Sequence, residues 1–304
     1  MMISLRQVQK KFGARTAVDE LTLSVPRGEI FGLLGHNGAG KSTAIGMMLG
    51  QVWPTQGEVK VCGYDVTVQR ARALQRVGAI FETPAFYDYL SGRRNLEILS
   101  HYSAPTSPER IRQVVDWVGL TGREQSAVKT YSHGMRARLA IAQALLPQPE
   151  LLIFDEPGSG LDPEGIAEMR QTIARLHREL DLTILLSSHL LSEVEQLCTR
   201  IAVLNHGRKV FEGRIADIKA APGRVLLRTP DFNAATALLR ERGIIIGAVD
   251  GKGIVLNEGR TTAEAAKVLV EANIPVEGIW PQEQTLEDFY LDLVKTTGPE
   301  AKQD

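Results

Sequence analysis

Cysteine is scarce in this sequence, and its scarcity excludes disulfide-rich and zinc-binding folds. The chain has 304 residues and two cysteines, Cys62 and Cys198. Two cysteines cannot form a multi-disulfide scaffold, and no metal-ligand spacing is present. Both stand among apolar neighbours, so we predict a pair of buried, reduced thiols.

Long apolar runs and an excess of basic charge are also missing. No run approaches the roughly 18 residues that span a bilayer, and the N-terminus lacks the apolar core of a signal peptide. We therefore expect a cytoplasmic protein that reaches a membrane only through a partner, peripheral at its inner face. The net charge is -1, which argues against a general nucleic-acid binder.

Apolar strand patterns alternate with helical patterns over residues 1–217. The sequence predicts strands at 3–8, 21–25, 29–34, 57–62, 77–81, 151–154, 183–187 and 201–204, and helices at 41–49, 94–100, 108–118, 135–146 and 163–179. This alternation predicts an α/β fold with a parallel sheet. Helical patterns dominate residues 86–148, which we assign to a helical subdomain.

The pattern changes near residues 220–223. The sequence then predicts strands at 224–228, 244–249, 253–256 and 276–280, and helices at 234–242, 262–272 and 286–294. The order matches a ferredoxin-like split unit. We assign residues 224–296 to a small α+β accessory domain and 297–304 to a polar tail. The sequence of the accessory domain shows no catalytic cluster, so we interpret it as a regulatory or subunit-contact module.

A phosphate-binding pattern, G-x-x-x-x-G-K-[ST], lies between the strand at 29–34 and the helix at 41–49. Glycines allow backbone N–H groups to turn towards phosphate oxygens, and the helix offers its positive end to the same anion. We expect the lysine to reach the outer phosphates and the serine to ligate Mg²⁺. The predicted nucleotide-binding residues are Gly35, His36, Asn37, Gly38, Ala39, Gly40, Lys41, Ser42 and Thr43.

Two acids end the apolar strand at 151–154. Asp155 and Glu156 emerge where ligands of α/β sheets bind. Asp155 is expected to hold Mg²⁺, and Glu156 to act as general base towards the attacking water. A solvated Asp-Glu pair at a strand end is common. The phosphate pattern on the same chain favours the catalytic interpretation.

Three further segments surround these motifs. They are Tyr131-Ser132-His133-Gly134-Met135-Arg136, Ser159-Gly160-Leu161-Asp162-Pro163 and Ser187-Ser188-His189. Together with the phosphate pattern and the acid pair, and in the same order, they resemble the motifs of ABC ATPases over residues 1–217. The resemblance implies an ATPase that uses ATP and Mg²⁺ and works as a head-to-tail homodimer with two ATP molecules between its subunits.

The resemblance also implies roles for single residues. Ser132 and Gly134 would contact the γ-phosphate held by the partner subunit's phosphate loop. His189 would sense the γ-phosphate and Asp162 would align the opposite site. Phe12 occupies the position that stacks on adenine; a plain core phenylalanine is the alternative.

The sequence departs from the family at two places. His133 and Met135 replace a glycine and a glutamine of the usual signature, whereas Ser132 and Gly134 are kept. Glu82 stands where the family has a glutamine that meets Mg²⁺ or water. It is either a Mg²⁺-proximal carboxylate or a solvated residue before a proline turn. Both features resemble the branch of bacitracin- and drug-export ATPases.

The leading hypothesis is therefore an ATPase that powers export through separate integral membrane permease subunits, with residues 82–95 as the candidate docking surface. The alternative is an ABC ATPase acting on nucleic acid or ribosomes. Tandem cassettes, coiled-coil insertions and zinc modules are typical of that class and are not found here, so no nucleic acid is expected as a partner.

Overall fold

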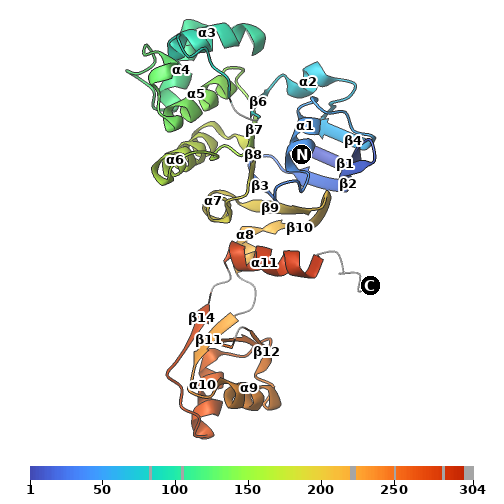
Figure 1. Cartoon of the computed structure of the whole chain (residues 1–304), viewed down its shortest axis with the longest axis vertical. Coiled ribbons are helices and arrows are strands. Elements are labelled where there is room, and N and C mark those ends of the chain that lie inside the picture. The colour runs from blue at the N-terminus through green and yellow to red at the C-terminus, as the bar shows by residue number, and fades with distance from the viewer. Residues whose placement is uncertain (82–83, 104–105, 220–223, 250, 283–284, 298–304) are drawn as a thin grey trace. The chain divides into compact units, whose positions relative to one another are not determined.

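The computed structural model describes residues 1–304 apart from 82–83, 104–105, 220–223, 250, 283–284 and 298–304. The chain divides into two compact units (Figure 1), one built on Met1–Arg214 and the other on Ile215–Thr296. Each unit has its own hydrophobic core.

The first unit contains two sheets. The antiparallel sheet has the order β2-β1-β4-β5, with β1 Ile3–Phe12, β2 Arg15–Val25, β4 Gln56–Val61 and β5 Tyr64–Asp65. The larger sheet has the order β10-β9-β3-β8-β7-β6, with β3 Ile30–Leu34, β6 Val77–Ile80, β7 Leu151–Asp155, β8 Thr183–Ser188, β9 Arg200–Asn205 and β10 Arg208–Arg214. All its neighbours pair in parallel except β9 and β10, so the predicted parallel α/β sheet is confirmed.

The helices of this unit are α1 Lys41–Met48, α2 Arg70–Leu74, α3 Gly92–Ser103, α4 Pro108–Trp117, η1 Val128–Thr130, α5 His133–Leu145, α6 Pro163–Leu180 and α7 Leu191–Leu197. Helices α3, α4 and α5 pack against one another and form a separate layer in Figure 1. Short β5, α2 and α7 had no signal in the sequence, because elements of this length carry too few periodic positions. Strand β10 was missed because none of its residues is fully buried, which leaves it without an apolar pattern.

The central strands explain the continuous apolar runs. Every residue of β3, β7 and β8 is buried, since helices cover both faces of the sheet. On one face, Phe31 and Leu33 join a core shared with α1 and the antiparallel sheet. On the other, a Cβ at Gly32 would lie 2.8 Å from Val194 of α7. A glycine is therefore needed there for α7 to approach the sheet.

The two cysteines differ in burial. Cys198 is 8% exposed, as predicted, and burial raises the pKa of its thiol. Cys62 lies after β4 in the turn to β5 and is only half-buried, so the prediction of a buried thiol is wrong there. Both thiols are free.

The second unit contains α8 Ile215–Lys219, β11 Arg224–Arg228, α9 Phe232–Glu241, β12 Ile245–Val249, β13 Gly253–Leu256, α10 Thr262–Glu271, β14 Gly278–Gln282 and α11 Leu286–Thr297. Its sheet is antiparallel throughout, in the order β12-β13-β11-β14. Thr261 and Glu264 form a capping box at the start of α10, which fixes where that helix begins. Within the described ranges, no helix combines the length and the apolar character needed to cross a bilayer.

Candidate functional site

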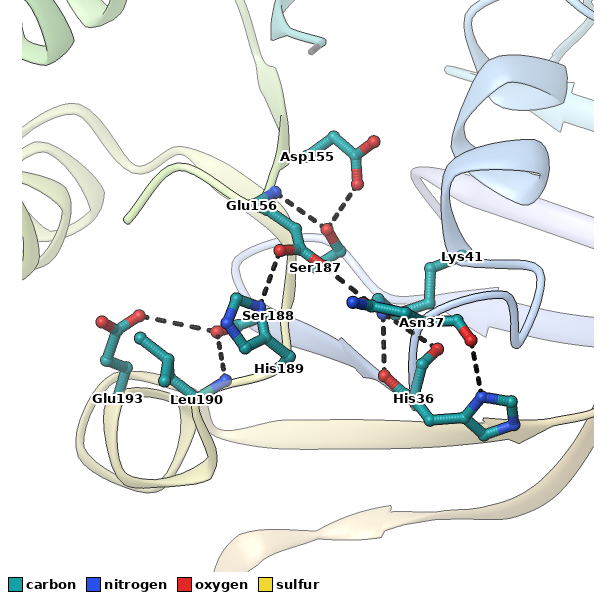
Figure 2. A network of polar contacts seen from close by, with 11 residues as sticks. His36, Asn37, Lys41, Asp155, Glu156, Ser187, Ser188, His189, Leu190 and Glu193 are labelled. Atoms are coloured by element: carbon teal, nitrogen blue, oxygen red, sulfur yellow. Dashed lines mark hydrogen bonds and ion pairs between the residues drawn. The ribbon is translucent and has the colours of Figure 1, made fainter. Parts of the chain in front are cut away.

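The strand order of the larger sheet brings three predicted motifs to one edge. Strand β8 lies between β3 and β7, and Ser188 pairs with Leu34 on one side while Ser187 pairs with Asp155 on the other. The carboxyl ends of parallel strands meet at one edge. The loop after β3, the acids at the end of β7 and the histidine after β8 therefore converge (Figure 2).

The loop after β3 has the backbone that phosphate binding requires. Gly38 and Gly40 have φ values of 86° and 105°, a region that favours glycine. A Cβ at Gly40 would also lie 2.6 Å from the carbonyl oxygen of Ala17, so the loop passes close to β2. Helix α1 begins at Lys41 without a side-chain cap, which leaves its first N–H groups open to an anion.

A cavity of about 290 Å³ lies against this loop. It is lined by Arg15, Ala17, Asn37, Gly38, Gly40, Lys41, Ser42, Thr43 and Glu156. Most of the predicted nucleotide-binding residues thus face one space together with the predicted base. His36 is exposed beside it, and its Nδ1 lies 2.7 Å from the Asn37 carbonyl oxygen.

Lys41 is held inside the loop by backbone and by charge. Its side chain is 5% exposed, and Nζ donates to the Gly35 carbonyl oxygen at 2.7 Å. Nζ also lies 3.4 Å from Oε1 of Glu156. A buried ammonium needs such partners. The lysine and the acid therefore face each other across the space that a phosphate would enter.

Asp155 is oriented by a residue that the sequence did not single out. The carboxyl group is nearly buried, and the hydroxyl of Ser187 donates to Oδ1 at 2.5 Å. The oxygen of the same hydroxyl accepts the Glu156 N–H at 2.9 Å. Ser187 was visible only as part of a motif. Its role depends on strand pairing that the linear sequence does not display.

Glu156 turns out of the strand with a left-handed backbone, φ 49°. Its carboxylate reaches Lys41 through Oε1 and accepts a hydrogen bond from Nδ1 of His189, at 2.7 Å, through Oε2. The side chain is 26% exposed. It also lines a second cavity, of about 680 Å³, together with Ser42 and Asp155. The predicted base thus contacts both the predicted cation and the predicted sensor.

Glu193 is a further acid near His189, and sequence reasoning missed it. The Ser188 hydroxyl donates to Oε2 at 3.5 Å, while Oε1 is buried and has no hydrogen-bond partner in the described part of the chain. Burial raises the pKa of this carboxyl, and the charge of His189 opposes the shift. In Figure 2, dashed lines join Ser188 to Glu193 and to Leu190, next to the histidine. No signal marked it in advance, because an acid in a short helix usually faces solvent.

The remaining predicted residues lie elsewhere. Ser132 and Asp162 are N-caps: Ser132 accepts from the Met135 N–H at 3.2 Å, and Asp162 from the Gly165 N–H at 3.0 Å. Neither these caps nor Gly134 lines the cavity of about 290 Å³ at the phosphate loop. A single chain therefore does not bring them into that cavity.

Two predicted residues stand apart from these. Phe12 is 51% exposed, with Lys10 Nζ 4.7 Å from its ring centroid. Phe12 is therefore not a core residue, and the alternative of a plain core phenylalanine is wrong. Glu82 lies outside the described residues, so its role stays a prediction.

Comparison with known proteins agrees with this geometry. A family model described as "ABC transporter" matches residues 18–159. The bacitracin transport ATP-binding protein BcrA of Bacillus licheniformis is 37% identical over 297 residues, which cover 96% of this chain and 97% of BcrA.

Two solved structures share the fold of the first unit. A structure described as the ATP-binding subunit of an ABC transporter is 28% identical, with a TM-score of 0.64, and the match covers 72% of this chain and 92% of the other. The dimeric structure of MJ0796, a bacterial ABC transporter cassette, is 23% identical with a TM-score of 0.63, covering 70% and 99%.

Proposed function

The chain belongs to the ATP-binding proteins of ABC transporters, close to the bacitracin- and drug-export branch, and from this premise we propose that it powers export of a substrate through separate membrane subunits. The observation that carries the proposal is the convergence of Lys41, Asp155, Glu156 and His189 at one sheet edge. These residue types at these distances suit phosphoryl transfer to water.

ATP would bind with its phosphates in the cavity lined by the loop and Lys41. Backbone N–H groups and the start of α1 would hold the phosphate oxygens. Lys41 would exchange its contact with Glu156 for the outer phosphates. Glu156, held by His189 at 2.7 Å, would then take a proton from the attacking water.

The residues at the acid pair fit Mg²⁺. Ser42 is exposed, and it lines the cavity of about 680 Å³ together with Asp155, one of whose carboxylate oxygens accepts a hydrogen bond from Ser187. These are hard oxygen donors, and Mg²⁺ is usually held by few protein ligands together with substrate phosphates and water. Over the described residues, no group of three or more His, Cys, Asp or Glu side chains could hold a metal by itself. When bound, Mg²⁺ would neutralise charge on the phosphates.

The second half of each site would come from another copy of the chain. Ser132 and Gly134 stand at the start of α5, where a hydroxyl and the backbone N–H groups of the helix start would form a second anion site. Asp162 begins α6 in the same way. MJ0796, which shares the fold, is described as dimeric. We infer that this chain also forms a dimer, arranged head to tail, with exposed Phe12 stacking on adenine.

Residues 1–217 would form the ATPase domain and residues 224–296 the accessory domain. The strand–helix–strand–strand–helix–strand order and the antiparallel sheet order β12-β13-β11-β14 support a ferredoxin-like unit. We infer a role in subunit contact for this unit.

The membrane partner can be tested directly. Tagged chain should recover one or two integral membrane proteins from detergent-solubilised membranes, and those subunits should raise its ATPase rate in vesicles. The exposed Tyr87 and Tyr89, whose rings meet edge to face, belong to the proposed docking surface at the inner face of the membrane. Recovery of ribosomes or nucleic acid, with no membrane protein, would contradict the proposal.

A further inference from the structure

One cation at the phosphate loop has no part in the motifs described above. Arg15 begins β2 and pairs with Phe12 across the two-residue turn that joins β1 to β2. It lines the cavity of about 290 Å³ together with Asn37, Gly38 and Lys41. The turn between β1 and β2 thus brings an arginine to the loop that the phosphate pattern predicted.

The geometry of the loop leaves room for this arginine. A Cβ built on Gly38 would lie 4.0 Å from Nη2 of Arg15, and Gly38 has a φ of 86°. Because this position has no side chain, the guanidinium can approach the loop backbone. Lys41 reaches the same loop from the inside, with Nζ 2.7 Å from the Gly35 carbonyl oxygen.

The charges around the cavity are not balanced. Its charged lining residues are Arg15, Lys41 and Glu156. Lys41 lies 3.4 Å from Glu156, which also accepts a hydrogen bond from His189. Within the part of the chain that the structure describes, the Arg15 side chain makes no hydrogen bond or ion pair. The arginine therefore supplies a positive charge that no protein group at the cavity neutralises.

Some other arginines of the first unit are ion-paired. Arg27 and Arg76 both pair with Glu150, and Arg208 pairs with Asp19. An unpaired arginine on an open surface is ordinary. Here it faces a space bounded by a phosphate-binding loop, a helix start and a lysine.

We propose that Arg15 is a phosphate-binding residue of this site, recognising the phosphate chain of a nucleotide. A guanidinium presents donors in a planar fork that matches two phosphate oxygens, and hydrogen bonds between charged groups are the strong ones. The proposal rests on the proposed function, because it requires a nucleotide at the loop. It adds a contact from β2 to those made by the loop and α1.

Nucleotide affinity of the full chain tests this assignment. Arg15→Gln leaves a shorter, uncharged polar side chain, Arg15→Lys keeps the charge without the fork, and Lys41→Ala sets the scale for losing a phosphate contact. Arg6→Gln is the matched control, because Arg6 is an exposed arginine on the neighbouring strand β1 and does not line the cavity. Dissociation constants for ATP and ADP are measured by competition with a fluorescent nucleotide, at low and high salt.

We expect Arg15→Gln to weaken ATP and ADP binding about tenfold or more at low salt, and the loss to shrink at high salt. Arg15→Lys should fall between parent and Arg15→Gln, and Arg6→Gln should match the parent. Thermal unfolding checks that each variant is folded.

Three outcomes would overturn the assignment. Arg15→Gln could bind within twofold of the parent, Arg6→Gln could lose as much affinity, or the loss could be unchanged by salt. If the folded parent itself binds no ATP, the proposed function fails and the assignment falls with it. A parent that binds ATP alongside an unaffected Arg15→Gln variant refutes the assignment alone.

Discussion

Replacing Glu156 by glutamine should move catalysis and binding in opposite directions. The carboxylate is the expected base, and it also lies 3.4 Å from Lys41 Nζ in the space that a phosphate would enter. Removing a general base costs about 10²- to 10⁴-fold in rate. Glutamine keeps the size of glutamate, so the loss would reflect chemistry and not packing.

The effect on binding follows from the same contact. At an effective dielectric constant of about 20, two unit charges at this separation attract by about 5 kcal/mol. ATP must replace this attraction when it takes Lys41, although much of it is recovered as Glu156 becomes hydrated. Without the carboxylate Lys41 has no ion pair to give up, and we expect ATP to bind about three- to tenfold tighter, or about 1 kcal/mol.

The assays are phosphate release, nucleotide affinity and molar mass in solution. With ATP and Mg²⁺ the variant should accumulate as a dimer, because hydrolysis would normally open it. Glu164→Gln is the matched control, since Glu164 is an exposed acid in the first turn of α6 that lines neither cavity at the site. Its turnover and affinity should equal those of the parent.

Two results would refute this reasoning. Turnover within about threefold of the parent would remove Glu156 as the base, since the expected loss is far larger. Weaker ATP binding in a folded Glu156→Gln variant would mean that the contact with Lys41 does not compete with phosphate.

The remaining predictions concern Gly40 of the phosphate loop, Glu193 and the accessory unit. Gly40→Ala should lower the melting temperature more than Gly63→Ala: both have positive φ, but only a Cβ at Gly40 meets a carbonyl oxygen, that of Ala17 at 2.6 Å; equal shifts would show that the close approach is unimportant. Glu193 has a raised pKa because it is buried, so the folded state keeps its proton longer than the unfolded state, and stability is lost as pH rises from the ordinary glutamate value of 4.5 through the folded pKa. The melting temperature of Glu193→Gln should therefore equal that of the parent at about pH 4. At higher pH the variant should melt at a higher temperature than the parent, by an amount that grows as pH rises; a difference that is constant with pH would contradict this. Deleting residues 224–304 should leave ATP affinity unchanged, because the loop cavity is lined entirely by the first unit; lost affinity in a folded truncation would place the boundary elsewhere.

Much of the fold could be predicted, for a physical reason that differs between elements. The strands β3, β7 and β8 are buried on both faces, so their composition is apolar throughout and stands out in the sequence. Helices α4 and α6 are amphipathic and begin at a capping residue followed by proline, which marks their starts. Short elements such as α7 carry no comparable signal.

The candidate site could be predicted only in part. The phosphate loop is local, because glycines at fixed positions impose its backbone, and its residues could be predicted from their order alone. The contributions of Ser187 and Glu193 were missed, since each acts through a residue on a neighbouring element. Arg15 was missed because it comes from β2 and belongs to no motif.

The types and order of residues along the chain were enough to predict the phosphate loop, the acid pair and the family. The distances between these motifs could be obtained only from the folded chain, because they depend on which strands become neighbours. The placement of β8 between β3 and β7 sets Glu156 between Lys41 and His189. The same folding leaves Ser132 and Gly134 outside the cavity at their own chain's phosphate loop, because a parallel sheet gathers only the ends of adjacent strands at one point.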